Sequence, residues 1–368
     1  MSRDLLFVSA GLDLDGGGRA LAGRLLASAC EEYAGARGLR VSVLALGGGG
    51  GPEGTRYFGR DQRRLAVEVW RRQLGDGLRG RRPVLVFDLL GPARIQAWLP
   101  GRLRAPYLIP LYGIEVWRPL SWERRRAMAR AAVRFAISRH TVERALPFVP
   151  RLAGPPATEV VPLALEERQA AGAVDAGLLR RLGLGYLLIV GRMASGERYK
   201  GHEPILEALT DLPEARLVVV GEGDDRHRIA ARAADLGLAH RVTFTGFVSE
   251  ATLLEIYRRA AVFVMPSLGE GFGLVYLEAM RAGKPCVAAR GSAAEEVVVH
   301  GQTGLLVGPD GTGKPTGELA AALRTFLDSP ETARRMGEAG RRRWREEFGA
   351  DRFRSRVAPL LDRLLEAS

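Results

Sequence analysis

Residues 186–209 have the sequence YLLIVGRMASGERYKGHEPILEAL, and this stretch shows how the chain is built. An apolar run, Tyr186–Val190, leads into a loop rich in glycine and charge, and a helical pattern starts at Glu203. The same order recurs along the chain, with apolar runs such as Leu5–Ser9 and Val84–Phe87. These runs show little polar alternation, which is typical of parallel strands covered on both faces. The sequence therefore predicts a doubly wound parallel α/β architecture.

The length and the strand pattern predict two domains. A chain of 368 residues allows about two domains, and about twelve expected strands are too many for one compact open sheet. We place the first domain at 1–165 and the second at 183–345, with residues 166–182 as a connector that has no strand pattern. An amphipathic helix in 350–368 is expected to pack back on the first domain. Ligands bind outside the carboxyl ends of such strands, so we expect the site in the cleft between the domains.

Composition narrows the class of protein. Hydrophobic residues make up 46% of the chain, which is typical of a globular protein. No apolar run approaches the length of a spanning helix, and two cysteines exclude a disulfide framework. No signal peptide is evident at Met1–Val8, so a cytoplasmic protein is expected. An arginine-rich coding bias is the simpler explanation of the net charge of +12, although the positive field would still favour anionic partners.

The loop after Tyr186–Val190 is the first candidate for chemistry. Arg192 lies at the strand end and Lys200 at the entry to the next helix, so the two cations could clamp a diphosphate. Only three lysines occur in the chain, which favours a role for Lys200. The alternative is a solvated basic loop.

A second candidate follows the apolar run Val262–Met265. Glycines at 271 and 273 would let the backbone approach a ligand, and the helix starting at Leu274 would direct its N–H groups toward an anion. Glu270 lies in the loop and Glu278 on the helix, where an isolated carboxylate is costly unless it binds something such as sugar hydroxyls. The alternative is that both glutamates are solvated or terminate the helix.

These two motifs resemble family 4 of the retaining glycosyltransferases, the glycosyl transferases group 1, which have the two-domain GT-B fold. The spacing from Glu270 to Glu278 is similar to that family's best-known motif, and Arg192 and Lys200 match its diphosphate-binding pair. The resemblance is dense over 186–310, where Val218–Gly223 and Val242–Val248 also match.

The resemblance implies a role for each matching residue. Arg192 and Lys200 would neutralise the donor diphosphate, Glu270 would contact the transferred sugar, and Glu278 would accept hydrogen bonds from the ribose. Further donor contacts are expected from the second domain's backbone and from the first domain's glycine loop and tyrosine: Gly246, Phe247, Val248, Gly271, Phe272, Gly273, Leu274, Gly16, Gly17, Gly18 and Tyr112.

The first half departs from the family pattern. Tyr112 stands where many members have a histidine that touches the donor sugar, and tyrosine can bind a hydroxyl but cannot shuttle protons near neutral pH. Ser138 matches a common motif, yet we interpret it as a plain helix N-cap. The carboxylates Asp13 and Asp15 have metal-ligand spacing, but we expect them to shape their loop.

The resulting hypothesis is a metal-independent hexosyltransferase without a cofactor. It would use a UDP- or GDP-sugar donor and a saccharide or lipid-linked acceptor in cell-surface glycan or glycolipid synthesis, stabilising the departing diphosphate by charge. A transferase-like scaffold that binds without turnover is the alternative. The sequence contains no recognition signature for nucleic acids, and its glycine spacing is not that of a dehydrogenase. Gly308–Lys314 is similar to a P-loop, but the next residue is Pro315 where a P-loop has serine or threonine, and proline has no N–H to donate.

Two basic stretches predict contact with an anionic membrane surface. Their alternative is a solvated arginine-rich face. The arginines and the accompanying aromatic and apolar residues are Arg63, Arg64, Arg71, Arg72, Arg79, Arg81, Arg82, Val67, Val69, Trp70 and Leu74 in the first stretch, and Arg118, Arg124, Arg125, Arg126, Arg130, Trp117 and Trp122 in the second.

Overall fold

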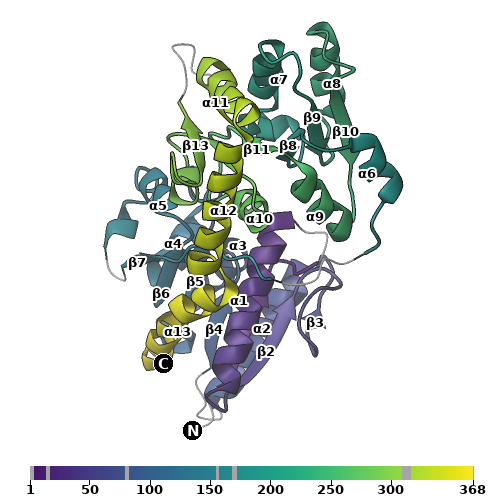
Figure 1. Ribbon diagram of the computed structural model, residues 1–368. Helices are drawn as coiled ribbons and strands as arrows, with labels where there is room; N and C mark the ends of the chain where they lie inside the picture. Colours follow the sequence, from purple (N-terminus) through teal and green to yellow (C-terminus); the bar gives the residue numbers. More distant parts are fainter. Residues whose placement is uncertain are drawn as a thin grey trace. The chain divides into compact units, whose positions relative to one another are not determined.

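The computed structural model describes residues 4–13, 17–78, 83–154, 157–167, 172–308 and 316–367. Its contacts divide the chain into two compact units, Met1–Ala164 with Ala350–Ser368, and Leu165–Gly349. Figure 1 labels their helices and strands.

Unit 1 is a seven-stranded parallel sheet with the order β3-β2-β1-β4-β5-β6-β7. Its strands are β1 Asp4–Ser9, β2 Arg40–Ala45, β3 Arg56–Tyr57, β4 Val84–Phe87, β5 Tyr107–Leu111, β6 Val133–Ala136 and β7 Thr158–Val160. Its α-helices are α1 Gly17–Gly35, α2 Gln62–Leu78, α3 Leu90–Ala93, α4 Trp122–Arg130, α5 Arg139–Ala145 and α13 Ala350–Glu366, and short 3-10 turns are η1 Arg94–Ala97, η2 Gly101–Leu103 and η3 Pro150–Ala153.

Unit 2 is a six-stranded parallel sheet with the order β10-β9-β8-β11-β12-β13. Its strands are β8 Leu187–Val190, β9 Leu217–Val220, β10 Val242–Gly246, β11 Val262–Met265, β12 Cys286–Ala289 and β13 Gly304–Val307. Its helices are α6 Ala176–Leu182, α7 His202–Thr210, α8 Arg226–Asp235, α9 Glu250–Arg259, α10 Leu274–Arg281, α11 Thr316–Asp328 and α12 Pro330–Glu347, with 3-10 turns η4 Ser195–Lys200 and η5 Ala293–Glu296.

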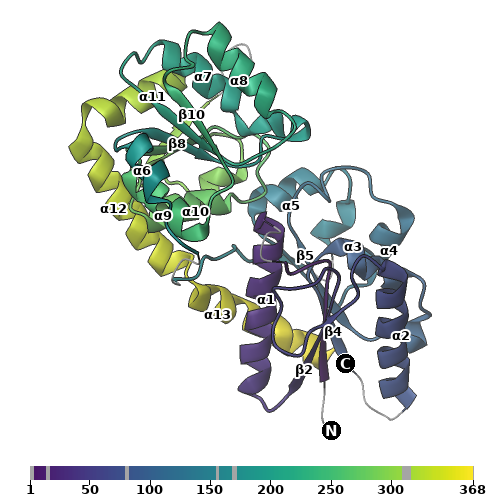
Figure 2. The same ribbon diagram turned by 90° about the vertical axis from the view of Figure 1, so that its right-hand side faces the viewer.

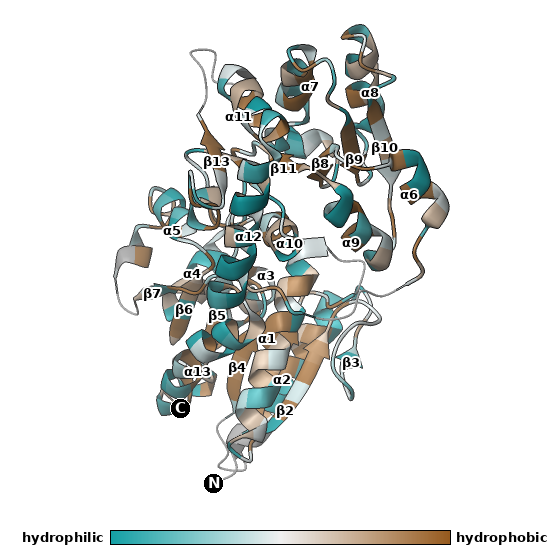
Figure 3. Ribbon diagram, viewed as in Figure 1, coloured by the Kyte–Doolittle hydropathy of each residue, from teal (hydrophilic) through white to brown (hydrophobic). Residues whose placement is uncertain are grey.

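Both sheets have apolar strands, as Figure 3 shows for β4, β8 and β9. Val84–Phe87 and Leu217–Val220 are buried along their whole length. Such strands must be covered on both faces, and the helices supply that cover. The predicted doubly wound parallel α/β class is therefore confirmed, with the two-residue strand β3 as an element that the sequence analysis did not predict.

The C-terminal helix α13 belongs to unit 1, where it contacts α1 (Figure 2). Its apolar face, including Phe353, Val357 and Leu361, is buried. The Tyr33 hydroxyl on α1 donates to Asp362 on α13 at 2.5 Å. The burial of that face explains why the last stretch of the sequence has a strong helical period.

Two local predictions have direct outcomes. Ser138 caps α5, because its hydroxyl accepts a hydrogen bond from the Thr141 amide at 3.0 Å, which confirms the cap. The predicted connector was wrong in part, since Ala176–Leu182 forms α6, capped by Asp175. The P-loop imitation lies mostly outside the described residues, as do Asp15, Gly16, Arg79, Arg81 and Arg82.

Candidate functional site

Both predicted motifs of unit 2 lie at the same edge of its sheet. Strands β8 and β11 pair at the point where the strand order reverses, which is where doubly wound sheets bind ligands. The loop at 191–201 follows β8 and the loop at 266–273 follows β11. The Leu268 amide donates to the Tyr199 carbonyl at 3.1 Å and joins the two loops.

Glycines let the neighbouring loops approach this edge. A Cβ on Gly223 would lie 2.0 Å from the Met193 carbonyl oxygen, so only glycine allows that packing. The Gly221 amide donates to the Gly246 carbonyl at 3.1 Å. The loop that begins at Gly246, which is predicted to contact the donor, therefore starts at the same edge. It continues with Phe247 and Val248, and Phe247 is 79% exposed.

The predicted clamp residues Arg192 and Lys200 are brought together by a carboxylate. The Glu197 carboxylate forms an ion pair with Lys200, with 2.8 Å between Nζ and Oε2. Its other oxygen forms an ion pair with Arg192. The side chain of Lys200 is 14% exposed and that of Arg192 is 63% exposed. Glu197 was missed by the sequence analysis, although a carboxylate between two cations in one loop was a visible signal. Its carboxylate is a counter-charge for both cations in this structure.

Replacing Glu197 with glutamine is expected to tighten nucleoside diphosphate binding. A diphosphate must displace the carboxylate from both cations, and the neutral amide competes less for them. We expect UDP or GDP to bind about tenfold more tightly, or about 1.4 kcal/mol, by titration calorimetry. Unchanged or weaker binding would show that Glu197 does not compete with the ligand.

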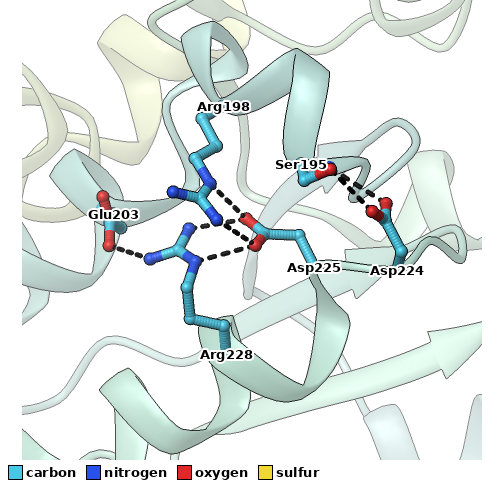
Figure 4. A network of polar contacts seen from close by, with 6 residues as sticks. All are labelled: Ser195, Arg198, Glu203, Asp224, Asp225 and Arg228. Atoms are coloured by element: carbon cyan, nitrogen blue, oxygen red, sulfur yellow. Dashed lines mark hydrogen bonds and ion pairs between the residues drawn. The ribbon is translucent and has the colours of Figure 1, made fainter.

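A polar network fixes the loop that carries Lys200 (Figure 4). Arg198 and Arg228 both donate to the Asp225 carboxylate, at 2.9 Å and 2.6 Å for their closest contacts. The Ser195 hydroxyl donates to Asp224 at 2.6 Å. The arginine hydrogen bonds hold the pKa of Asp225 well below its usual value. The network therefore ties η4 to the start of α8 with charges that stay in place at neutral pH.

His202 is buried next to this loop and is neutral at pH 7. Burial, and then the Lys200 charge, lower its pKa to about 4, while Asp225 opposes and Arg228 adds to the shift. As the pH falls below about 6.5, His202 takes up a proton in the unfolded chain before it does so in the folded protein. The free energy of unfolding therefore decreases as the pH falls from 6.5 toward 4. His202 thus cannot serve as a cationic phosphate ligand at neutral pH.

The variant His202→Gln is expected to remove part of the acid sensitivity of unit 2. Relative to pH 7.5, the wild type should lose about 2 kcal/mol at pH 5 through this group, and the variant should not. Denaturant unfolding at both pH values measures the difference. Equal pH dependence in the two proteins would mean that His202 keeps its ordinary pKa when folded.

The second motif forms the other side of the candidate site. Gly273 has φ of +91° and begins α10, and a Cβ there would lie 2.4 Å from the Tyr276 ring. Glu270 is half-buried and accepts from the Ser267 hydroxyl at 3.5 Å. Burial raises the pKa of Glu270, while Lys200 lowers it, so the two predicted residues are within electrostatic reach. Gly271, Phe272 and Leu274 lie between these features at the start of the helix.

Glu278 has a partner that the sequence did not reveal. The Tyr257 hydroxyl on α9 donates to its Oε2 atom at 2.7 Å. Burial raises the pKa of the Glu278 carboxyl, and the Tyr257 hydrogen bond opposes that shift. The glutamate remains half-buried, whereas Tyr257 is 2% exposed. Tyr257 therefore orients one carboxylate oxygen, and no hydrogen bond or ion pair from the described residues holds the other.

The unit 1 residues lie at the corresponding edge of their own sheet. Gly17 and Gly18 begin α1 after the β1 strand. Tyr112 follows β5, and burial together with Asp88 and Glu115 raises its pKa well above the usual value. Tyr112 is thus a neutral hydroxyl, as its chemistry predicts.

Asp88 is a further buried group at this edge that the sequence analysis missed. It follows β4 directly and accepts from the Ser9 hydroxyl at 2.5 Å and the Ala10 amide at 2.9 Å. Burial raises its pKa to about 7. An acidic residue directly after an apolar strand was the available signal. Asp13 in turn accepts from the Gly48 and Gly49 amides at 3.1 and 3.0 Å, so its carboxylate holds the loop after β2 and not its own loop.

Residues 179–343 match the family model described as Glycosyl transferases group 1. That segment, slightly less than half of the chain, is similar to this family. All the predicted donor residues of unit 2 lie inside it. The glycosyl transferases group 1 match ends before α13 and does not include unit 1.

Three comparisons show what this chain is similar to. It is 36% identical to the glycogen synthase of Mycobacterium tuberculosis over 46% of this chain and 40% of that one. It is 35% identical to a GDP-mannose-dependent alpha-(1-6)-phosphatidylinositol monomannoside mannosyltransferase of Mycolicibacterium smegmatis, over 52% of each chain. These matches span about half the length of the relatives or less.

The third comparison concerns the fold. The structure of Anabaena HepE in complex with UDP and glucose has a TM-score of 0.75 to this chain at 19% identity, and the match covers 98% of this chain and 100% of HepE. The likeness confirms the expected GT-B class with two Rossmann-like units.

Proposed function

We propose that this chain is a retaining glycosyltransferase that moves a hexose from a UDP- or GDP-sugar to a hydroxyl acceptor. The observation that carries the proposal is the meeting of Lys200, Arg192, Glu270 and the start of α10 at the switch point of the unit 2 sheet. All of these residues lie within the family segment. The mannosyltransferase relative, named for GDP-mannose, and HepE, solved with UDP, support a nucleotide-sugar donor without choosing its base.

The residues supply charge and orientation for the transfer. Lys200 and Arg192 would bind the diphosphate, the amides that begin α10 would face its oxygens, and Glu270 would hold sugar hydroxyls. The bond from the sugar's anomeric carbon to the phosphate oxygen breaks, and the acceptor oxygen bonds to that carbon on the same face. The acceptor's proton passes to the departing phosphate oxygen. Fixed cations favour this step because negative charge develops on the diphosphate.

A donor screen followed by a transfer assay tests the proposal. A ligand at about 100 times its dissociation constant stabilises the folded protein by about 2.7 kcal/mol, so UDP or GDP should raise the melting temperature. The matching nucleotide sugar should then release its nucleoside diphosphate in the presence of acceptor, with no loss of rate in EDTA if the reaction is metal-independent. Stabilisation without release of the sugar would favour the binding-only scaffold instead. No stabilisation by either nucleotide would contradict both functions.

We also propose that unit 1 contacts an anionic membrane surface in a peripheral manner. Trp98 and Trp122 are 61% and 45% exposed and pack edge to face with 4.7 Å between ring centroids. Trp122 also lines a cavity of about 600 Å³ with Arg125, Arg126 and Arg130. Exposed indoles beside arginines suit a bilayer interface.

The other predicted basic stretch supports this contact less. Glu68 pairs with Arg56, Arg71 and Arg72, so the cations of that face are partly neutralised within the protein. Trp117 donates to the Thr141 carbonyl at 3.3 Å and is half-buried. The proposed contact surface is therefore the Trp98–Trp122 pair with the α4 arginines. None of the helices within the described ranges is long and apolar enough to cross a bilayer.

Vesicle flotation tests the membrane contact. The protein should float with vesicles of phosphatidylglycerol and phosphatidylcholine at low salt, and binding should weaken at high salt because surface charges are screened. The double variant Trp98→Ala, Trp122→Ala should lose most of the binding, whereas Arg71→Gln should retain it. Equal flotation with pure phosphatidylcholine, or none with either vesicle, would overturn the proposal.

A further inference from the structure

Unit 1 has a cavity at its own topological switch point. The order of its sheet reverses between β1 and β4, which pair directly. Residues that end or follow these two strands, among them Ala10 and Leu89, line a cavity of about 350 Å³. Its walls are completed by the start of α2 and by α3, both labelled in Figure 2. We call this cavity the β1–β4 pocket. Its position and volume are those of a small-molecule site.

The walls of the β1–β4 pocket are largely apolar. The apolar lining side chains are Val8, Leu46, Leu65, Leu89, Leu90 and Ile95. A bare saccharide in such a cavity would leave hydroxyl groups without hydrogen-bond partners, which is unfavourable. The pocket is instead suited to a ligand with an apolar body.

Positive charge dominates the polar part of the lining. Arg19, Arg94 and Arg124 line the pocket, and among the described residues none of them forms an ion pair with a carboxylate. Glu115 is the one acidic lining residue, and it accepts from the Tyr112 amide at 2.5 Å. Glu123 is near Arg94 and Arg124 but pairs with neither. Three cations against one carboxylate favour an anionic ligand.

We propose that the β1–β4 pocket binds a molecule that joins an apolar chain or ring system to a phosphate or carboxylate group. The inference rests on the proposed function and names the class of its hydroxyl acceptor. Arg94 and Arg124 bind the anionic group, and the apolar body lies against Leu90 and Ile95. The acceptor is thus an anionic amphiphile rather than a bare saccharide.

Direct binding of n-octyl phosphate tests the ligand class without any need for turnover. Below its micellar concentration it should bind at least tenfold more tightly than inorganic phosphate and than n-octyl β-D-glucoside, by titration calorimetry. The first comparison isolates the apolar body and the second isolates the anionic group. Equal affinities in either comparison would overturn the proposal.

Two arginines of unit 1 provide a matched pair of variants. Arg124 lines the β1–β4 pocket, whereas the exposed Arg102 in η2 lines neither this pocket nor the cavity beside Trp122. Arg124→Ala should weaken octyl phosphate binding about tenfold, while Arg102→Ala removes the same charge from the same unit and should change it less than twofold. Ala66→Leu, on a partly exposed helix position, should fill the pocket and also weaken binding. Equal effects of the two arginine variants would place the ligand elsewhere.

The outcomes separate this inference from the proposed function. Transfer activity without selective octyl phosphate binding would overturn the ligand class and leave the glycosyltransferase intact. Selective binding that depends on Arg124, in a protein without transfer from any nucleotide sugar, would support the pocket's ligand class and overturn the proposed reaction.

Discussion

Lys200→Met is expected to lower kcat/KM for the nucleotide sugar about a thousandfold, or about 4 kcal/mol of transition-state stabilisation. The ammonium of Lys200 is only 14% exposed and lies at the switch point beside Glu270. Methionine retains the length and the apolar stem but removes the charge that we propose stabilises the departing diphosphate. Steady-state kinetics with the donor identified by the screen measures the loss.

Lys284→Met is the matched control for this variant. Lys284 precedes β12, so it lies toward the amino ends of the strands, away from the edge that carries Lys200. The control removes the same charge from the same unit and should change kcat/KM less than threefold. A similar loss in both variants would mean that net charge, not position, determines the rate. Wild-type turnover in Lys200→Met would contradict the assignment of Lys200.

Glu278→Gln is expected to lower kcat/KM about a hundredfold, or about 2.7 kcal/mol, mainly through KM for the donor. We propose that Glu278 accepts hydrogen bonds from the ribose hydroxyls, and an amide offers only one acceptor oxygen for them. Alanine is a poorer choice, because the buried Tyr257 hydroxyl would lose its acceptor at 2.7 Å and keep only the Val275 carbonyl at 3.4 Å, which would also change the stability of the fold.

Tyr257→Phe separates ligand binding from positioning. The variant keeps the Glu278 carboxylate and removes only the hydroxyl that orients it at 2.7 Å. We expect a loss in kcat/KM of less than about tenfold, roughly one hydrogen bond's net worth. The control is that both variants unfold at the wild-type denaturant concentration. An equal loss of kcat/KM in Tyr257→Phe and Glu278→Gln would then mean that Glu278 acts through Tyr257 and not on the ribose.

The alternation of strand and helix was predictable because buried parallel strands leave a simple signature. Runs such as Leu217–Val220 are apolar on both faces, and their helices begin at capping residues such as Ser138. The exceptions are short or depend on tertiary contacts. β3, Arg56–Tyr57, has two residues and no apolar run. The helix α6 was not predicted, because it is short and the burial of its three leucines depends on packing against other elements.

The candidate site was predictable in its strand-end loops but not in its internal contacts. Arg192, Lys200 and Glu270 follow strands that the topology then makes neighbours. The pairing of Glu197 with both cations and of Tyr257 with Glu278 depends on side-chain directions, which sequence spacing does not specify. The β1–β4 pocket depends on the order of strands in the sheet, which cannot be obtained from apolar runs alone.

A crystal structure with the nucleoside diphosphate that stabilises the protein tests the central claim most directly. We predict that its diphosphate lies within hydrogen-bond distance of Lys200 Nζ and the Arg192 guanidinium, with Glu197 displaced from at least one of them. The start of α10 should face the phosphate oxygens, and the ribose should contact Glu278. A diphosphate bound away from the β8 and β11 loops, with Glu197 still paired to both cations, would contradict the account.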